Sequence, residues 1–401
     1  MNALVADGAR DLEYVTAKNY PIAAMPEIRE IRPRGNTTIT NPNSQEVIFD
    51  LNKYQYLTSL MIRTQLTRAN TATLVGKFYG LTMYEQITIR TMNRVLQTLS
   101  DSYIRARTDN LPDEHKMAVL RRALLLVPTT ELVAADTATT GVTYTPIYSQ
   151  FFDSPRNYLN LSFLEQLQVT ARFNSVVPSG SGVVWTDAVP TLMVGSWLPE
   201  LTYSQMLEAK NYGKMLTMQC YNSAKQIIDI STSGGSATAI QAKLFTNNAV
   251  FNIHYAVVNK VAAGANSINT TLARIDTADL QFSGISCFGV LPNSVVNFKK
   301  EQTASCNQLT SATAVSRVQN SIGGANSYTG WSTIPLGLNT VAERGFSTGA
   351  VSFSNVNFPT LNLTYETLGA GVADYQLEVV YEFWNLITIN EQGMMLISAS
   401  Y

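Results

Sequence analysis

The five residues LNLSF at positions 159–163 return almost unchanged as LNLTY at positions 361–365. The likeness continues downstream of each copy, because QLQV at 166–169 corresponds to QLEV at 376–379. Both pairs alternate apolar and polar side chains, the pattern that turns one face of a β-strand to a core and the other to solvent. A repeat that falls on predicted strands indicates two similar β-domains in one chain.

A weaker third match lies upstream of this repeat, where IFDL at 48–51 resembles IIDI at 227–230. The three matches keep the same order, and the distance between the copies grows along the chain. Longer loops in the second domain would account for that growth. We therefore expect two consecutive β-sandwiches that differ mainly in their loops.

Short strand-like runs separated by turn residues occupy much of the chain. The clearest runs alternate apolar and polar residues, at 47–51, 60–66 and 87–89. Long connections rich in Gly, Ser, Asn and Thr lie between the runs, and the Ala/Thr-rich stretch 134–145 is expected to be an exposed loop. This organisation is typical of antiparallel sandwiches rather than α/β folds. The jelly roll is one of the few sandwiches that accommodate long loops at one end and protect their sheet edges.

We therefore predict an all-β protein with two consecutive eight-stranded jelly rolls and short helices in loops. The best helix candidate is DEHKMAVLRRALLLV at 113–127, because two acidic residues follow Pro112 at its start. The first jelly roll is expected at 46–178 and the second at 200–401. The Pro/Gly/Ser-rich stretch SVVPSGSGVV at 175–184 predicts a connection between them, which we place at 179–199.

Residues 1–45 are expected to form an N-terminal arm, because prolines interrupt the segment and few apolar residues repeat with a strand or helix period. Its prolines are Pro21, Pro26, Pro33 and Pro42. A short basic cluster consists of Arg29, Arg32 and Arg34. The arm is either a solvated extended segment or a contact to a neighbouring copy, to nucleic acid or to a lipid surface.

The composition excludes several classes of protein. Charged residues make up 14% of the 401 residues, where about 25% is usual, and a surface that carries so little charge is typical of a chain that packs against copies of itself. The net charge of −1 argues against an electrostatic nucleic-acid binder. No run of 18 or more apolar residues and no secretory signal occurs. Three widely spaced cysteines fit no disulfide or CxxC metal pattern, which favours a reduced, cytosolic site of synthesis.

The sequence predicts no catalytic, cofactor-binding or metal-binding residue. Only two histidines are available as a base for nucleophilic catalysis, His115 and His254. We expect His115 to be solvated at the start of the predicted helix. His254 lies in FNIHYAVV, where alternation places it on the face opposite Phe251, Ile253 and Tyr255, and a structural role is favoured. A zinc site needs three or four closely spaced His or Cys ligands, and no such group, Walker motif or GxGxxG motif occurs.

Three stretches resemble the double jelly-roll major capsid proteins of membrane-containing icosahedral DNA viruses. They are EVIFDLNKYQYLTSLMIRTQLT at 46–67, YTPIYSQFFDSPRNYLNLSFLEQLQVTARFNS at 144–175 and YQLEVVYEFWNLITINEQGMMLISAS at 375–400. The lineage includes tailless membrane phages, the adenovirus hexon, virophages and the nucleocytoplasmic large DNA viruses. The first stretch is similar to the family's opening strand pair, the second to the closing strands of its first jelly roll, and the third to its terminal strand and tail.

The resemblance implies a non-enzymatic structural protein of the virion. Three chains would bring six sandwiches together as a pseudo-hexagonal homotrimer, and the trimers would tile an icosahedral shell. Implied partners are the chain itself, neighbouring capsomers, and minor capsid or vertex proteins, with an internal viral membrane as a candidate partner of the N-terminal arm. No cofactor and no sequence-specific nucleic-acid binding is expected, and synthesis is expected in the host cytoplasm.

Two other classes of function stay open from the sequence. One is a minor capsid or vertex protein of the same lineage. The other is a carbohydrate- or receptor-binding β-sandwich, which would need an exposed aromatic platform or a Ca²⁺ loop with clustered Asp residues. Loops such as 303–333 contain neither feature.

Overall fold

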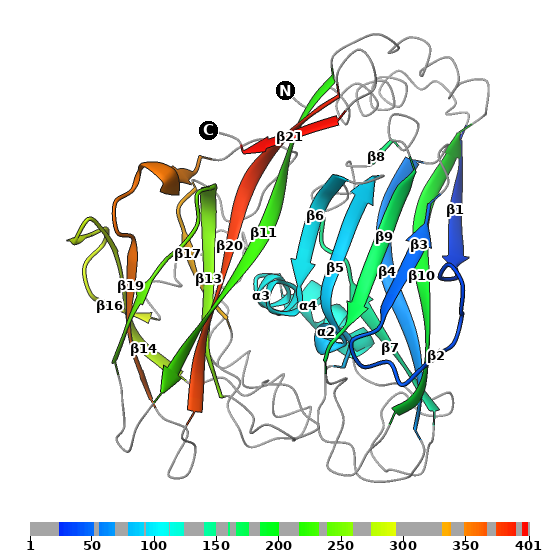
Figure 1. Ribbon diagram of the computed structural model, residues 1–401, viewed down its shortest axis with the longest axis horizontal. Coiled ribbons are helices and arrows are strands. Elements are labelled where there is room, and N and C mark those ends of the chain that lie inside the picture. The colour runs from blue at the N-terminus through cyan, green and yellow to red at the C-terminus, as the bar shows by residue number, and fades with distance from the viewer. Residues whose placement is uncertain are drawn as a thin grey trace.

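The four antiparallel sheets of the chain are seen in a computed structural model (Figure 1). The structure describes residues 24–51, 56–68, 79–91, 94–111, 113–123, 140–149, 159–160, 166–175, 185–199, 216–231, 239–259, 274–293, 331–337, 349–366, 374–389 and 395–399. Strands between residues 24 and 199 build two of the sheets, and strands between 216 and 399 build the other two. The chain therefore contains two sandwiches in succession, as the internal repeat predicts.

The first sandwich pairs a four-stranded with a six-stranded sheet. The smaller sheet has the order β3 (Glu46–Asp50), β9 (Leu167–Phe173), β5 (Tyr84–Thr91) and β6 (Arg94–Ser100). The larger has the order β1 (Ala24–Ile31), β10 (Trp185–Pro199), β4 (Tyr56–Arg68) and β7 (Thr140–Pro146), with β2 (Ile39–Thr40) beside β10 and β8 (Leu159–Asn160) beside β4.

The second sandwich pairs a six-stranded with a five-stranded sheet. The larger has the order β11 (Leu216–Ser231), β20 (Asp374–Ile389), β13 (Ala249–Asn259) and β17 (Ser332–Pro335), with β18 (Val351–Ser352) beside β13 and β21 (Met395–Ala399) beside β20. The other has the order β12 (Ala239–Lys243), β19 (Thr360–Glu366), β14 (Arg274–Phe282) and β15 (Ile285–Ser286), with β16 (Leu291–Pro292) beside β14.

Short helices join the strands of the first sandwich and lie toward the second one (Figure 1). They are α2 (Tyr79–Thr82), α3 (Asp101–Asp109) and α4 (Asp113–Ala123), and the second sandwich adds the 3-10 turn η2 (Phe353–Asn355). Helix α4 begins where the sequence predicts a helix and has described residues to Ala123. Its His115 is exposed, as expected.

The strand order confirms the jelly-roll repeat. In the sheets β3-β9-β5 and β11-β20-β13, an early strand of each jelly roll (β3 or β11) pairs with a late strand (β9 or β20). The late strand pairs on its other side with a second early strand (β5 or β13). The register corrects the sequence alignment by two residues. Asp50 lies opposite Gln168, and Asp229 lies opposite Gln376, so the glutamine equivalent to Gln376 is Gln168 and not Gln166.

Alternation along the strands builds a core inside each sandwich. In β4, for example, Leu60, Ile62 and Leu66 are buried in the first core. In β13 the side chains on both faces are buried. Ile253 and Tyr255 belong to the core of the second jelly roll, whereas Ala256 and Val258 join the cluster of the first. Both faces are covered because the sheet containing β13 also packs against the first jelly roll.

Two predicted non-strand segments take part in the first jelly roll, which is a correction to the expected arm and connection. Residues 24–31 of the arm and 185–199 of the connection form β1 and β10, and these pair over eight residues from Ala24↔Pro199 to Ile31↔Leu192. Pro26 is tolerated because β1 is an edge strand, where a missing N–H need not face a neighbour. The remaining division of the chain into domains stays a prediction.

Other boundaries also differ from the sequence expectation. Part of the expected loop at 134–145 belongs to β7, because Val142 and Tyr144 alternate with threonines against β4. Residues 216–231, which include the repeat stretch 227–230, form one continuous strand, β11. The strands of each sandwich exceed the expected eight because β1, β2 and β10 widen the first one and short strands such as β18 and β21 flank the second.

Candidate functional site

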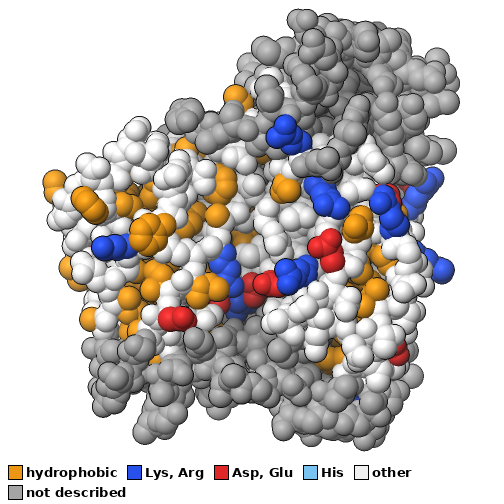
Figure 2. Space-filling model, in the orientation of Figure 1, with side chains coloured by type: hydrophobic (Ala, Val, Ile, Leu, Met, Phe, Trp, Pro, Cys, Tyr) orange, Lys and Arg blue, Asp and Glu red, His pale blue; other side chains and the backbone are white. Residues whose placement is uncertain are grey.

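A cluster of charged side chains lies where the two jelly rolls meet. Helix α3 of the first jelly roll, DSYIRARTD, faces β11, β13 and β20 of the second. Its start is fixed by Ser100, whose side chain accepts a hydrogen bond from the Tyr103 N–H at 3.1 Å. Figure 2 shows acidic and basic side chains close together in the middle of the view, where Figure 1 places α3 and β11. We call this contact the seam.

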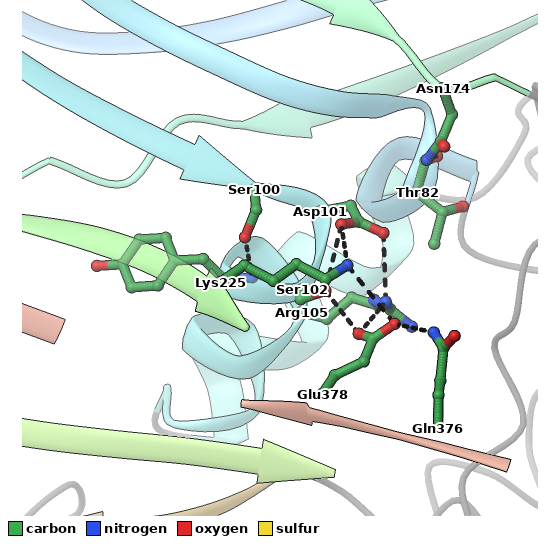
Figure 3. A network of polar contacts seen from close by, with 10 residues as sticks. Thr82, Ser100, Asp101, Ser102, Arg105, Asn174, Lys225, Gln376 and Glu378 are labelled. Atoms are coloured by element: carbon green, nitrogen blue, oxygen red, sulfur yellow. Dashed lines mark hydrogen bonds and ion pairs between the residues drawn. The ribbon is translucent and has the colours of Figure 1, made fainter. Parts of the chain in front are cut away.

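One half of the seam is a balanced group of two carboxylates and two cations (Figure 3). Glu378 on β20 accepts hydrogen bonds from the Ser102 hydroxyl at 2.6 Å and from Arg105 at 3.3 Å. Arg105 also contacts Asp101 at 3.3 Å. Lys225 on β11 reaches Asp101 at 3.2 Å and Glu378 at 3.5 Å. The formal charges cancel, so the buried ions are paired as burial requires.

The pKa of Asp101 reflects this balance. Burial alone would raise the pKa of this carboxyl group, but Arg105 and Lys225 outweigh that effect and lower it below its usual range. Asp101 is therefore ionised at neutral pH. The pairs join residues from both jelly rolls, because Lys225 and Glu378 come from the second and Asp101 and Arg105 from the first.

The other half of the seam surrounds Glu382, which is completely buried on β20. Its carboxylate accepts hydrogen bonds from Tyr103 at 2.6 Å and from Asn252 at 2.8 Å. Arg107 lies 3.6 Å away, and His254 Nε2 lies 3.4 Å away. Burial would raise the pKa of Glu382, but Arg107 and the hydrogen bond from His254 lower it to about 2. Glu382 is thus an ionised acceptor that needs donors from both jelly rolls.

His254 is a buried structural residue, as the sequence predicts. Its Nδ1 lies 2.8 Å from the Thr333 hydroxyl and 3.3 Å from the Asn110 amide nitrogen. Because the Asn110 amide nitrogen can only donate, Nδ1 acts as an acceptor and Nε2–H points to Glu382. The side chain has no exposed surface, so a substrate in solution has no access to it.

Aromatic side chains continue the seam beyond the ions. Trp384 stacks on Phe251 with ring centroids 4.8 Å apart, and Arg107 lies over the Tyr221 ring at 5.7 Å. Phe251 corrects the sequence expectation that it faces away from His254. A β-bulge between Val250 and Asn252 shifts the register, and Phe251 packs in the cluster that faces the first jelly roll.

The seam joins the two jelly rolls through paired charges. Its carboxylates already bind Arg, Lys, Tyr, Ser and Asn donors, which leaves no uncompensated negative charge for a cation. Within the described ranges, no group of three or more His, Cys, Asp or Glu side chains could hold a metal ion. No helix of the described part of the chain is long and apolar enough to cross a membrane.

The sequence did not single out the residues of the seam. One signal was available, because LEVVYEFW at 377–384 places two glutamates on one face of an otherwise apolar strand. Such residues are rarely buried unless they are paired. The sequence could not show that their partners come from α3, more than 270 positions earlier in the chain.

No protein-family model and no curated protein matches the chain. Solved structures do match. VP54 of PBCV-1 superposes with a TM-score of 0.68 over 95% of this chain and 98% of its own, at 15% identity. The mavirus major capsid protein gives 0.58 over 96% and 93%, at 11% identity, and the Faustovirus major capsid protein gives 0.58 over 91% and 90%, also at 11%. The fold is therefore the double jelly roll of these viral capsid proteins.

Proposed function

We propose that the chain is the major capsid protein of an icosahedral virus and acts as a structural, non-enzymatic protein. The observation that carries the proposal is the superposition on viral capsid proteins over nearly the full length of both chains, through both jelly rolls. The low charge fraction of 14% supports it, because the cores of obligate interfaces exclude charge.

The proposed assembly unit is a homotrimer with a pseudo-hexagonal outline. Two similar sandwiches per chain supply six in a trimer, and the seam fixes the two sandwiches of one chain against each other. A rigid two-lobed subunit can close into a ring through head-to-tail contacts. Neighbouring trimers would then tile the shell.

Further proposed partners are minor capsid or vertex proteins and an internal viral membrane. The membrane contact was expected from the N-terminal arm and its basic cluster. Two of those arginines form ion pairs, Arg29 with Glu27 and Arg34 with Asp50, which leaves less free positive charge for a lipid surface. Residues 1–23 of the arm lie outside the described residues. We propose location in the virion, after synthesis in the host cytoplasm.

The proposal is tested on purified virus particles. Quantitative mass spectrometry should find this chain as the most abundant protein, and electron microscopy should show a shell of pseudo-hexagonal capsomers. A chain present at only a few copies per particle would contradict the proposed role and would fit a minor capsid or vertex protein.

A further inference from the structure

Exposed apolar side chains gather in the connections at one end of the second jelly roll. Seven large apolar side chains are exposed among the described residues, and four of them lie there. They are Phe245, Ile285, Val290 and Phe358, which are 73%, 74%, 69% and 79% exposed. Figure 2 shows hydrophobic side chains spread over the side of the second sandwich where Figure 1 places β16 and β19. We call these four side chains the apolar end.

Hydrogen bonds between backbone groups join the three connections side by side. The Leu244 N–H donates to the Pro359 carbonyl at 2.9 Å, and the Ser283 N–H donates to the Asn357 carbonyl at 2.8 Å. The connection before β19 therefore lies between the connection after β12 and the one after β14, in the order of the strands. The apolar end is thus one surface built from three parts of the chain.

The backbone holds the two phenylalanines of this surface in fixed places. Phe358 has a φ of 48°, and Ser283 on the neighbouring connection has a φ of 54°. A bulky residue seldom adopts a positive φ, and strained backbone is retained mainly where the position serves a function. The Phe245 N–H donates to the Gln226 side chain at 3.1 Å. The exposure of the phenylalanines is therefore a fixed feature of the fold.

The connections that carry the apolar end contain no charge. Neither Asp, Glu, Lys, Arg nor His occurs in LFTNN at 244–248, SGISCFGVLP at 283–292 or GAVSFSNVNFP at 349–359. Large exposed apolar patches mark contacts with a protein or a membrane. The lack of basic residues argues against nucleic acid or any other polyanion as the partner.

We propose that the apolar end inserts into an uncharged lipid bilayer. The inference rests on the proposed internal viral membrane and names the surface that meets it. The four side chains protrude singly, because each keeps about 70% or more of its surface exposed. Side chains that protrude singly offer a helix or strand of a partner protein no groove to lie in. A fluid bilayer needs no groove, because its acyl chains close around each apolar group separately.

The missing charge also determines which lipids should bind. Basic clusters attract anionic headgroups, and salt screens that attraction. The apolar end has no such cluster, so removal of apolar surface from water must drive the contact. Binding should therefore be equal on vesicles of phosphatidylcholine and on vesicles that also contain phosphatidylserine, and high salt should not weaken it.

Vesicle flotation with the purified full-length chain provides the first test. The unmodified chain should float with phosphatidylcholine vesicles at low and at high salt. Phe245→Ser combined with Phe358→Asn should weaken binding about tenfold or more, and Asn is chosen because it tolerates a positive φ. The matched control combines Ile28→Thr with Val95→Thr, two exposed apolar positions of the first jelly roll, and should float like the unmodified chain.

Two outcomes of the flotation test would overturn the inference. One is equal binding of the two double variants, which would mean that the phenylalanines do not contact lipid. The other is flotation that needs phosphatidylserine and is lost at high salt, which would assign the contact to basic residues elsewhere in the chain.

Fluorescence quenching locates the contact on the molecule. Ile285→Trp places an added fluorophore at the apolar end, and Ile28→Trp places one at a similarly exposed position on β1. Vesicles of phosphatidylcholine with brominated acyl chains should quench the added fluorescence of Ile285→Trp and leave that of Ile28→Trp unchanged. Equal quenching of both variants, or quenching of Ile28→Trp alone, would overturn the inference.

Light scattering of the same unmodified sample separates this inference from the proposed function. A trimer that does not float overturns the lipid contact and leaves the capsid role in place. A monomer that floats, with quenching at Ile285→Trp, supports the lipid contact and contradicts the proposed capsomer.

Discussion

Glu382 shows how single residues hold the two jelly rolls together. An ionised carboxylate without exposed surface is costly unless donors replace water. Tyr103 and Arg107 come from the first jelly roll, and Asn252 and His254 come from the second. Because neither jelly roll alone satisfies Glu382, the relative position of the two is part of the folded state.

Replacing this carboxylate should destabilise the protein strongly. Glu382→Gln leaves Arg107 without its counter-charge, and loss of one partner of a buried ion pair costs about 3 kcal/mol or more. The control is Glu85→Gln, because Glu85 pairs with Arg172 on the surface with both side chains about half exposed, where such pairs contribute about 0–1 kcal/mol. Urea unfolding measures both. Equal midpoints for the two variants would contradict the role given to Glu382.

The backbones of α2 and β7 lie so close together that Gly80 cannot be replaced by a residue with a side chain without a shift. A Cβ added at Gly80 in α2 would lie 2.0 Å from the carbonyl oxygen of Tyr144 on β7. Gly80→Ala should therefore push α2 away from β7 and cost about 1–3 kcal/mol, seen as a lower melting temperature. A variant as stable as the unmodified protein would show that this contact is looser than described.

At the scale of elements, β1 and β10 extend the first sheet. They come from opposite ends of the first half of the chain and pair along eight residues. Charged side chains on β1, among them Glu27, Arg29 and Glu30, protect this outer edge against pairing with other chains. The strand thus covers β10, which would otherwise be an edge.

N-terminal truncation tests whether residues 24–31 act as a strand of the sheet or as a solvated arm. A chain that begins at residue 32 loses β1 and exposes the edge of β10, so it should aggregate or melt several degrees lower. A chain that begins at residue 24 keeps every described strand and should melt like the full-length protein. Thermal unfolding with light scattering compares the three. Identical behaviour of the two truncated chains would show that β1 adds nothing to the sheet.

The sequence predicted elements well where a local period carried the information. Strands form at the runs 47–51, 60–66 and 87–89, at the second copy of the repeat and at 159–160 and 167–169 of the first, and a helix begins at Asp113. Residues 161–163 of the first copy lie outside the described residues. The sequence did not predict β1 and β10. Prolines and charged residues interrupt the alternation of apolar and polar side chains there, and each strand forms by pairing with a segment far away in the sequence. The residues of the seam could not be predicted for the same reason, because no local sequence pattern shows which charged side chains are buried between the two jelly rolls.

At the scale of the whole molecule, the seam makes stability depend on acidity. The pKa values of Glu382 and Asp101 are lowered in the folded state. A lowered carboxyl pKa stabilises the fold above the unfolded pKa, about 4.3 for Glu. This stabilisation is lost as the pH falls through the folded value, about 2 for Glu382. The shift of Glu382 corresponds to about 3 kcal/mol at neutral pH.

The protein should therefore keep a constant contribution from Glu382 between about pH 5 and 7 and lose it between about pH 4 and 2. Urea unfolding at a series of pH values measures this dependence. Glu382→Gln should show a weaker loss over the same acid range, because the titrating group is gone. An unchanged acid dependence in the variant would mean that Glu382 does not carry it.

Two jelly rolls held together by the seam should form one rigid subunit of a trimeric capsomer. Native mass spectrometry of the purified chain measures the oligomeric state. We expect one dominant species at three times 44.0 kDa, with a threefold, pseudo-hexagonal outline in electron micrographs of the same sample. A stable, folded monomer at 44.0 kDa across micromolar concentrations would contradict it.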